Sequence, residues 1–142
     1  MLTRFALSTI ASGARGNITA VDVRVFAGSY PDPDQPLHWR HNRDFSGNNI
    51  MSLGIWYEQV MRWVGPAASA FAVGQVVVPY RRDSSGARVA ISVPDHIDVV
   101  GHLQQGGQYR LAVSSVVGHA PNLSEAYIFG DKGTLAFIAP AT

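Results

Sequence analysis

The residues whose types and spacing best suit chemistry lie between Ser46 and Pro66, in the segment SGNNIMSLGIWYEQVMRWVGP. On a helical period of 3.6 residues, one face of this segment carries two tryptophans, a serine and a glutamine. Flat aromatic rings and uncharged hydrogen-bonding groups are typical of a wall that binds a small molecule. Neither the serine nor the glutamine titrates near neutral pH, so this face favours binding over proton transfer. The four residues are Ser52, Trp56, Gln59 and Trp63.

The opposite face of the same helix is aliphatic and is expected to pack on the core. A glycine within it costs roughly 1 kcal/mol relative to alanine, which indicates close approach of another backbone or of a ligand. For the aromatic face, an equally open alternative to ligand binding is packing beneath the proline-rich loop that precedes the helix. The predicted core stripe is Ile50, Leu53, Gly54, Tyr57, Val60, Met61 and Val64.

The loop before this helix contains HWRHNR, a second group of residues with chemical potential. The planar fork of Arg40 suits an anion or a substrate hydroxyl. Trp39 suits stacking on a sugar ring or, equally, closing over the helix as a lid. His38 and His41 are three residues apart, but no carboxylate or third histidine completes a readable ligand pattern, so we predict no metal site.

A third motif, VPDHIDV, places His96 between Asp95 and Asp98. The arrangement resembles a proton relay, but no serine lies in a nucleophile-elbow pattern. We therefore expect Pro94 and Asp95 to form a turn into a strand, rather than part of a catalytic triad.

The elements that must position these groups follow from hydrophobic periodicity. A helix is expected over residues 2–12, and a second helix starts with Ser46 as its N-cap and ends at Gly65 and Pro66. Alternation with a period of two, separated by short turns, indicates a largely antiparallel sheet. The predicted class is therefore α+β, an open-faced, mostly antiparallel β-sheet with one or two helices packed on one face. Strands are expected at 17–28, 70–80, 89–93, 96–103, 108–117, 125–129 and 134–138, with a long loop after residue 28 and a turn at 81–87.

One substantial helix cannot cover both faces of such a sheet. Large apolar faces seldom remain wet, so the uncovered face is expected to be a surface for homo-oligomer formation. Candidate outward residues are Val76, Val78, Val113 and Val117.

Length and charge set further bounds on the protein. The chain of 142 residues fits one domain, 1–142, and 46% of its residues are hydrophobic. Eleven basic and ten acidic residues give a net charge of +1, without the clustered excess expected of nucleic-acid binding. The sequence contains no apolar run long enough for a membrane span and no export signal. It also contains no cysteine, so we expect a cytoplasmic protein.

Taken in order along the chain, these segments resemble the C-terminal domain of the Gfo/Idh/MocA oxidoreductases (glucose–fructose oxidoreductase, inositol dehydrogenase and relatives). LSTIASGARGNITAVDVRV resembles the helix, turn and first strand of that domain, and HWRHNRDFSG resembles the loop leading into its signature helix. SVPDHIDVVGHLQQGGQYRLAVSSVVG and EAYIFGDKGTL resemble its later strands and hairpin.

The family's signature helix reads G-G-G-x-x-x-D-x-G-x-H-x-x-D, and the carry-over onto this chain is partial. The later glycine is retained at Gly54, whereas the first triplet falls on Ser46, Gly47 and Asn48. The three ionisable positions of the family motif, an aspartate, the proton-transferring histidine and a second aspartate, all fall on neutral residues. In that order they are Ser52, Trp56 and Gln59.

The resemblance implies one part of an NAD(P)-dependent oxidoreductase that acts on a sugar, polyol or related alcohol or carbonyl compound. The family binds NAD or NADP on an N-terminal Rossmann domain, but no G-x-G-x-x-G turn follows a strand here, and the family's E-K-P lysine is missing. We therefore expect this chain alone to bind no dinucleotide and to be inactive. The residues expected to line the substrate cleft are Trp39, Arg40, Asn48, Asn49, Ser52, Trp56 and Gln59.

The alternative is a non-catalytic binding or interaction module derived from this family. A Rossmann segment encoded upstream of Met1 in the same reading frame would favour the enzyme, and a native start at Met1 would favour the module.

Overall fold

The computed structural model describes residues 16–48, 53–118 and 123–139 of the chain. The helix expected over residues 2–12 lies outside these ranges. None of the helices in the described ranges has the length and apolar character needed to cross a bilayer. The strands are β1 (Ile18–Phe26), β2 (Ala67–Gln75), β3 (Tyr80–Arg82), β4 (Arg88–Ala90), β5 (His96–Leu103), β6 (Gln108–Ser114), β7 (Leu123–Gly130) and β8 (Thr134–Ala139), and the helices are the 3-10 turn η1 (Trp39–His41), α2 (Arg43–Ser46) and α3 (Leu53–Val64).

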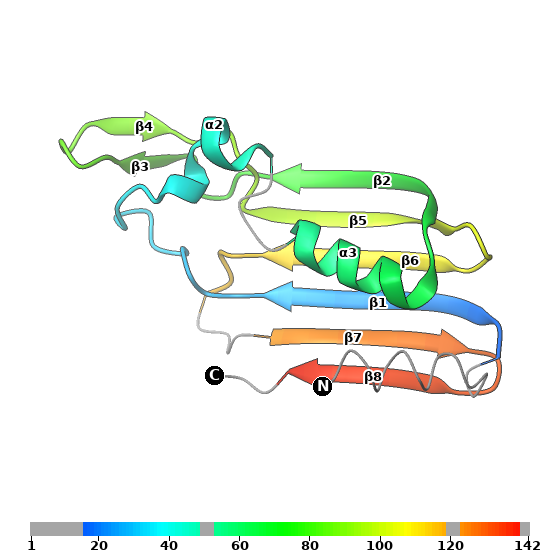
Figure 1. Cartoon of the computed structure of the whole chain (residues 1–142). Coiled ribbons are helices and arrows are strands. Elements are labelled where there is room, and N and C mark those ends of the chain that lie inside the picture. The colour runs from blue at the N-terminus through cyan, green and yellow to red at the C-terminus, as the bar shows by residue number, and fades with distance from the viewer. Residues whose placement is uncertain (1–15, 49–52, 119–122, 140–142) are drawn as a thin grey trace.

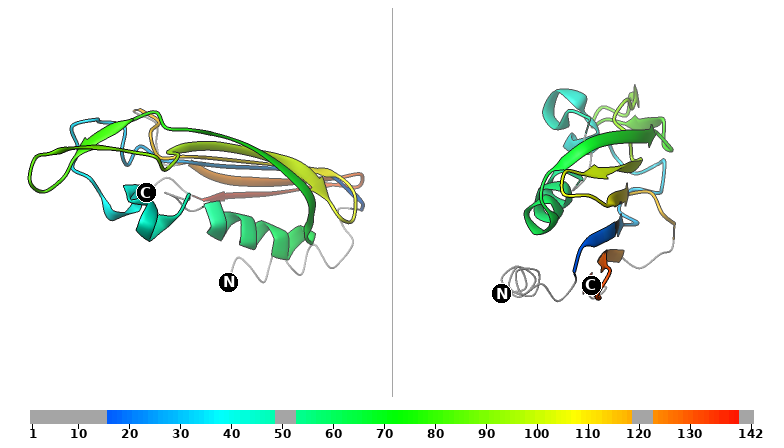
Figure 2. Two further views of the ribbon diagram at one scale, coloured as in Figure 1. Left: turned by 90° about the horizontal axis from the view of Figure 1, so that it is seen from above. Right: turned by 90° about the vertical axis from the view of Figure 1, so that its right-hand side faces the viewer.

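Six of the strands form one sheet in the order β2-β5-β6-β1-β7-β8, and β3 and β4 form a separate hairpin beside it (Figure 1). The pairing of β1 with β6 is parallel, and the other four neighbouring pairs of the large sheet are antiparallel. The α3 helix runs across one face, and η1 and α2 lie on that same side (Figure 2). The predicted class, an open-faced and mostly antiparallel α+β sheet, is confirmed.

The core lies between α3 and the face of the sheet that α3 covers. Along β1, Val21, Val23 and Val25 point into it and are at most 7% exposed, as the alternation of the sequence predicts. From α3, Val60 and Val64 meet these strand residues. Burying aliphatic side chains of this size contributes about 1.5–3 kcal/mol each, so this layer supplies much of the folding free energy.

The end of α3 is formed as its sequence predicts. Gly65 has a φ of 81°, in the left-handed region that favours glycine, and its N–H donates to the carbonyl of Met61 at 2.8 Å. Pro66 then prevents another helical turn. The Gln105 side chain donates to the carbonyl of Val64, which satisfies another acceptor at this helix end.

Several predicted boundaries are wrong. Ser46 is the last residue of α2, not the N-cap of the main helix, and its hydroxyl donates to the carbonyls of Arg40 and Asn42. The expected turn at 81–87 contains most of β3, which pairs with β4. Two of the four valines proposed to face outward are buried instead. Val113 is 0% exposed and Val78 is 6% exposed.

Gly101 in β5 occupies a position with no room for a side chain. A Cβ there would lie 1.9 Å from the carbonyl oxygen of Ser69 in β2 and 2.7 Å from the Tyr109 ring. We predict that Gly101→Ala lowers the free energy of unfolding by about 2 kcal/mol, because backbone and ring must both move. Urea denaturation measures this loss. The matched control is Gly118→Ala, where no atom lies within 4 Å of the added carbon, and equal stability of the two variants would contradict the prediction.

Candidate functional site

The loop that follows β1 is fixed to the end of the sheet by backbone hydrogen bonds. Ala27 N–H donates to the carbonyl of Ser114, and Tyr30 N–H donates to the carbonyl of Ser115, both at 2.9 Å. Further along, Leu37 N–H donates to the carbonyl of Arg82 in β3 at 2.8 Å. This loop leads directly to η1, so the sheet end and the small hairpin together set the position of Trp39 and Arg40.

A buried guanidinium strengthens this attachment. Arg81 is 2% exposed, and its two terminal nitrogens donate to the carbonyls of Tyr30 at 2.6 Å and Asp32 at 2.9 Å. Its guanidinium also lies 5.8 Å from the centre of the Tyr30 ring. Burial lowers the pKa of Arg81, whereas the negative charges of Asp95 and Asp32 oppose that shift. A charged group inside a protein is tolerated when it is hydrogen-bonded and partly compensated, as this one is.

Asp95 is a buried carboxylate whose negative charge acts on Arg81. It is 2% exposed and accepts hydrogen bonds from the backbone N–H groups of Val77 at 2.7 Å and Val78 at 3.0 Å. Its role in the fold is to hold the segment between β2 and β3, where a continuous strand over residues 70–80 was expected. The side chains of His96 and Asp98 lie on the sheet face that α3 does not cover, and they are 3.3 Å apart.

The two histidines of HWRHNR stabilise a tight turn. The Nδ1 atom of His38 accepts from Arg40 N–H at 3.3 Å, and the Nδ1 atom of His41 accepts from His38 N–H at 3.0 Å. The His41 ring packs edge-on against Tyr30, with ring centres 4.8 Å apart. Both histidines therefore act as capping groups for η1.

This turn presents Trp39 and Arg40 to the exterior. Trp39 is 54% exposed, and the Arg40 guanidinium lies 4.4 Å from the centre of the Trp39 ring. A guanidinium stacked on an indole offers both a flat apolar surface and charged hydrogen-bond donors. The pair is therefore suited to a ligand with hydroxyl or anionic groups.

The aromatic face of α3 packs differently from the prediction. Trp56 and Trp63 both contact Phe137 of β8, with ring centres 5.9 and 6.1 Å apart, and Trp63 is 7% exposed. Conversely, two residues of the predicted core stripe, Gly54 and Tyr57, are exposed. The buried side of α3 therefore includes the two tryptophans, because Phe137 of β8 packs against both of them. Periodicity along the helix gives no sign of this partner on a distant strand.

The remaining predicted cleft residues are only partly placed. Asn48 is exposed at the end of α2, and Gln59 is half-buried on α3, with its Nε2 atom unpartnered among the residues that the structure describes. Asn49 and Ser52 lie outside the described residues. The structure therefore brings Trp39 and Arg40 together and packs Trp56 on the core, while a cleft shared by all seven residues remains a prediction.

Tyr30, Arg81 and Asp95 were not predicted to support the site. Arg81 contacts residues 49 and 51 positions away in sequence, so local pattern gives no signal of the contact. Asp95 was predicted to form a turn. The backbone N–H groups of Val77 and Val78 that donate to its carboxylate were not predicted.

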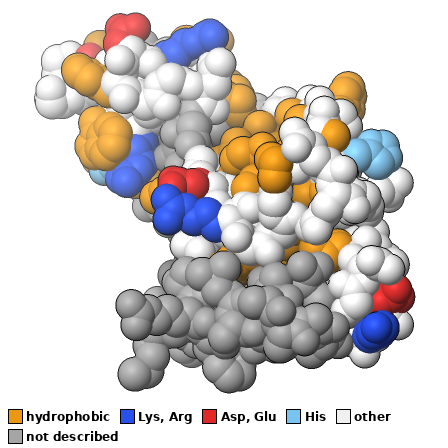
Figure 3. Space-filling view, turned by 45° about the vertical axis from the view of Figure 1, so that its right-hand side comes forward, with side chains coloured by type: hydrophobic (Ala, Val, Ile, Leu, Met, Phe, Trp, Pro, Cys, Tyr) orange, Lys and Arg blue, Asp and Glu red, His pale blue; other side chains and the backbone are white. Residues whose placement is uncertain are grey.

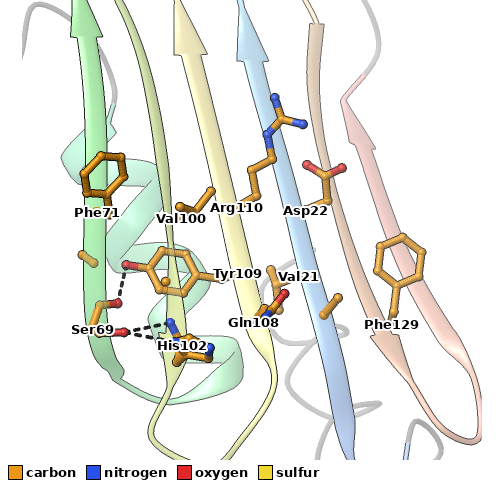
Figure 4. Close-up of a pocket in the computed structure, with 13 residues that line it drawn as sticks. Val21, Asp22, Ser69, Phe71, Val100, His102, Gln108, Tyr109, Arg110 and Phe129 are labelled. Carbon is orange, nitrogen blue, oxygen red and sulfur yellow. Dashed lines mark hydrogen bonds between the residues drawn. The ribbon is translucent and has the colours of Figure 1, made fainter.

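The uncovered face of the sheet carries charged side chains such as Asp22 and Arg110 beside exposed apolar side chains such as Phe71 and Val100 (Figure 4). Arg24 pairs with Asp22 at 3.1 Å, and Arg110 pairs with Asp98 at 3.1 Å. A shallow hollow of about 620 Å³ lies on this face, bordered by Phe71, Val100 and Phe129. The opposite face, which carries α3, also shows hydrophobic side chains among charged groups (Figure 3). Exposed apolar residues of the uncovered face include Phe71, Val73, Val100, Phe129 and Ile138.

Comparison with known proteins places this architecture in a family. The family model described as the GFO/IDH/MocA C-terminal domain matches residues 3–136, so the chain belongs to this family. Among curated proteins, none matches the sequence.

Solved structures share the fold at low sequence identity. An oxidoreductase domain protein from Kribbella flavida has 22% identity and a TM-score of 0.87, over 96% of this chain and 36% of that chain. Levoglucosan dehydrogenase, in complex with NADH and L-sorbose, has 20% identity and a TM-score of 0.84, over 94% and 36%. The WlbA dehydrogenase from Bordetella pertussis, in complex with NADH and UDP-GlcNAcA, has 20% identity and a TM-score of 0.77, over 96% and 39%. The chain thus spans little more than a third of the length of these proteins.

The pKa of His41 provides a test of its burial and of its proximity to Arg81. Burial, with the nearby charge of Arg81 as the second cause, lowers the pKa of His41 from 6.5 to about 4. Between these values the unfolded chain binds a proton that the folded chain does not, so stability falls as the pH falls through this window, by up to about 3 kcal/mol.

We predict that His41→Gln reduces this acid-side loss, measured by urea denaturation from pH 6.5 to 4. Arg81→Met should raise the pKa of His41 measured by NMR, because a neighbouring positive charge is removed, while burial still holds it below 6.5. An unchanged pKa of His41 in Arg81→Met would contradict the proposed contact.

Proposed function

We propose that this chain is the substrate-side and assembly domain of an NAD(P)-dependent oxidoreductase that acts on a sugar, polyol or related alcohol or carbonyl compound. The observation that carries the proposal is the family match over residues 3–136, together with the fold shared with dehydrogenases in NADH complexes. Those proteins are nearly three times as long as the matched region, which is consistent with a nucleotide-binding domain elsewhere in the whole protein.

We propose that this chain alone does not hold a dinucleotide. In the described part of the structure, the chain leaves β1 into the loop at 27–38, instead of a helix whose N-terminus could face a pyrophosphate. NAD or NADP, which would accept or supply the hydride, would therefore be held by a Rossmann domain outside this chain.

The contribution of this chain would be to bind and orient the substrate. Trp39 supplies an exposed ring for stacking, and Arg40 supplies a charged fork for a hydroxyl or carbonyl oxygen. The cap formed by His38 and His41 holds both in place, so little conformational freedom is lost on binding. Further wall residues are proposed at Asn48, Asn49, Ser52, Trp56 and Gln59.

A second candidate function is a non-catalytic binding module. It is favoured by the neutral residues Ser52, Trp56 and Gln59 at positions that are ionisable in the family motif, because none of them can transfer a proton near neutral pH. In the enzyme, the proton that accompanies hydride transfer would then have to come from a group outside these three positions.

We predict that the whole protein oxidises sugars or polyols with NAD or NADP, and that Arg40→Ala raises KM about tenfold, equivalent to about 1.4 kcal/mol of binding. Steady-state kinetics over a panel of sugars and polyols measures this. Arg43→Ala, which removes an exposed arginine three residues away, is the matched control. Absence of an upstream Rossmann segment, or of dinucleotide binding by the whole protein, would favour the module instead.

The uncovered sheet face is proposed as the surface for homo-oligomer formation. Val100 lies within it and is 44% exposed beside Phe71, its register partner in β2, which is 67% exposed. Adjacent exposed apolar residues of this size are typical of interfaces.

We predict that the chain self-associates and that Val100→Glu weakens the association at least tenfold, because a carboxylate would be buried without a partner. Sedimentation velocity over a concentration series gives the dissociation constants. The control Ile55→Glu changes a residue of α3 that is 73% exposed and should leave the association unchanged. A monomeric wild-type chain, or equal effects of the two variants, would contradict this interface.

A further inference from the structure

The β3–β4 hairpin holds two arginines directly opposite each other. Its register pairs Arg82 with Arg88 and Tyr80 with Ala90, so Tyr80, Arg82 and Arg88 share the hairpin face opposite to that of the buried Arg81. Side chains paired across strands have Cβ atoms roughly 4.5–5.5 Å apart, and like charges at that separation destabilise a sheet. Across residues 16–48, 53–118 and 123–139, neither arginine forms a salt bridge.

These arginines line a hollow that is shaped for a ligand. The hollow has a volume of about 250 Å³ and lies between the hairpin and the loop that contains Pro33 and Asp34. The Arg88 guanidinium lies 3.8 Å from the centre of the Tyr80 ring, which orients it, and Arg82 donates to the carbonyl of Gly86 at 3.1 Å. Both groups are therefore held in place before any ligand binds.

The local charge in this hollow is positive. Arg81 also borders it, with both terminal nitrogens committed to backbone carbonyls, so it adds positive potential without being free to contact a ligand through those atoms. Asp34 contributes one negative charge to the lining and pairs with none of the three arginines. Because Asp95 and Asp32 partly compensate Arg81, the excess comes mainly from Arg82 and Arg88 against the single carboxylate of Asp34, and an anion would neutralise it.

We propose that this hollow binds the phosphoryl group of a small organic phosphate. A phosphoryl group carries more negative charge than a carboxylate and has three terminal oxygens, so it can accept from both arginines at once. Pro33, Pro79 and Tyr80 supply an apolar wall for the organic part. The proposal is independent of the oxidoreductase function, because it concerns binding by this chain alone.

Calorimetric titration of the chain with inorganic phosphate and with AMP tests the proposal, with adenosine as the probe that lacks the phosphoryl group. Phosphate and AMP are expected to bind saturably, and adenosine is not. Arg88→Gln and Arg82→Gln should each weaken binding at least fivefold, while Arg88→Lys, which keeps the charge but loses the planar fork, should weaken it less. Asp34→Asn should tighten binding, because a repelling carboxylate is removed.

The matched control is Arg62→Gln, which removes an exposed arginine of α3 that pairs with Glu58. It should change phosphate binding less than twofold. Because Arg82 and Arg88 are exposed, their variants are expected to fold, and circular dichroism checks this. Lack of saturable phosphate binding, equal weakening by Arg62→Gln, or full binding by the Arg82→Gln/Arg88→Gln double variant would overturn the proposal.

Discussion

The α3 helix, which is 12 residues long, buries only the part of the sheet beneath it, and this limited cover governs the rest of the structure. Beneath it, the valines of β1 and the residues of β6 form a dry layer in which Val23 and Val113 are at most 1% exposed. On the other face, the same strands present ion pairs and apolar side chains to solvent. A sheet with one buried and one open face has to interact through the open one or tolerate exposed apolar area.

The second constraint is the attachment of the long loop after β1. Three neighbouring features hold it, namely the sheet end at Ser114 and Ser115, the buried guanidinium of Arg81, and the ring contact between Tyr30 and His41. A loop fixed by buried polar contacts can present Trp39 and Arg40 in one arrangement, which favours binding because less entropy is lost when a ligand arrives.

The β3–β4 hairpin connects these observations. Its inward residue, Arg81, organises the proposed substrate loop, whereas its outward residues, Arg82 and Arg88, form a cationic hollow of their own. Alternation along β3 thus separates the structural role of Arg81 from the proposed binding role of its neighbour Arg82. The same alternation assigns the valines of β1 to the core and Asp22 and Arg24 to the open face.

Much of the fold could be predicted from the sequence. Alternation located β1, β5 and β8 closely, and Gly65 with Pro66 fixed the end of α3, because these signals depend on residues adjacent in the chain. The family resemblance, carried by the order of motifs, also came from sequence alone and is confirmed by the match over residues 3–136.

Other features were decided by contacts between distant segments. Trp56 and Trp63 turned towards the core because Phe137, more than 70 residues later, packs against both. Arg81 became a buried anchor because its carbonyl partners at Tyr30 and Asp32 lie about 50 residues earlier. Periodicity identifies which residues share a helix or strand face, but which face is buried depends on the partner that the tertiary structure brings to it.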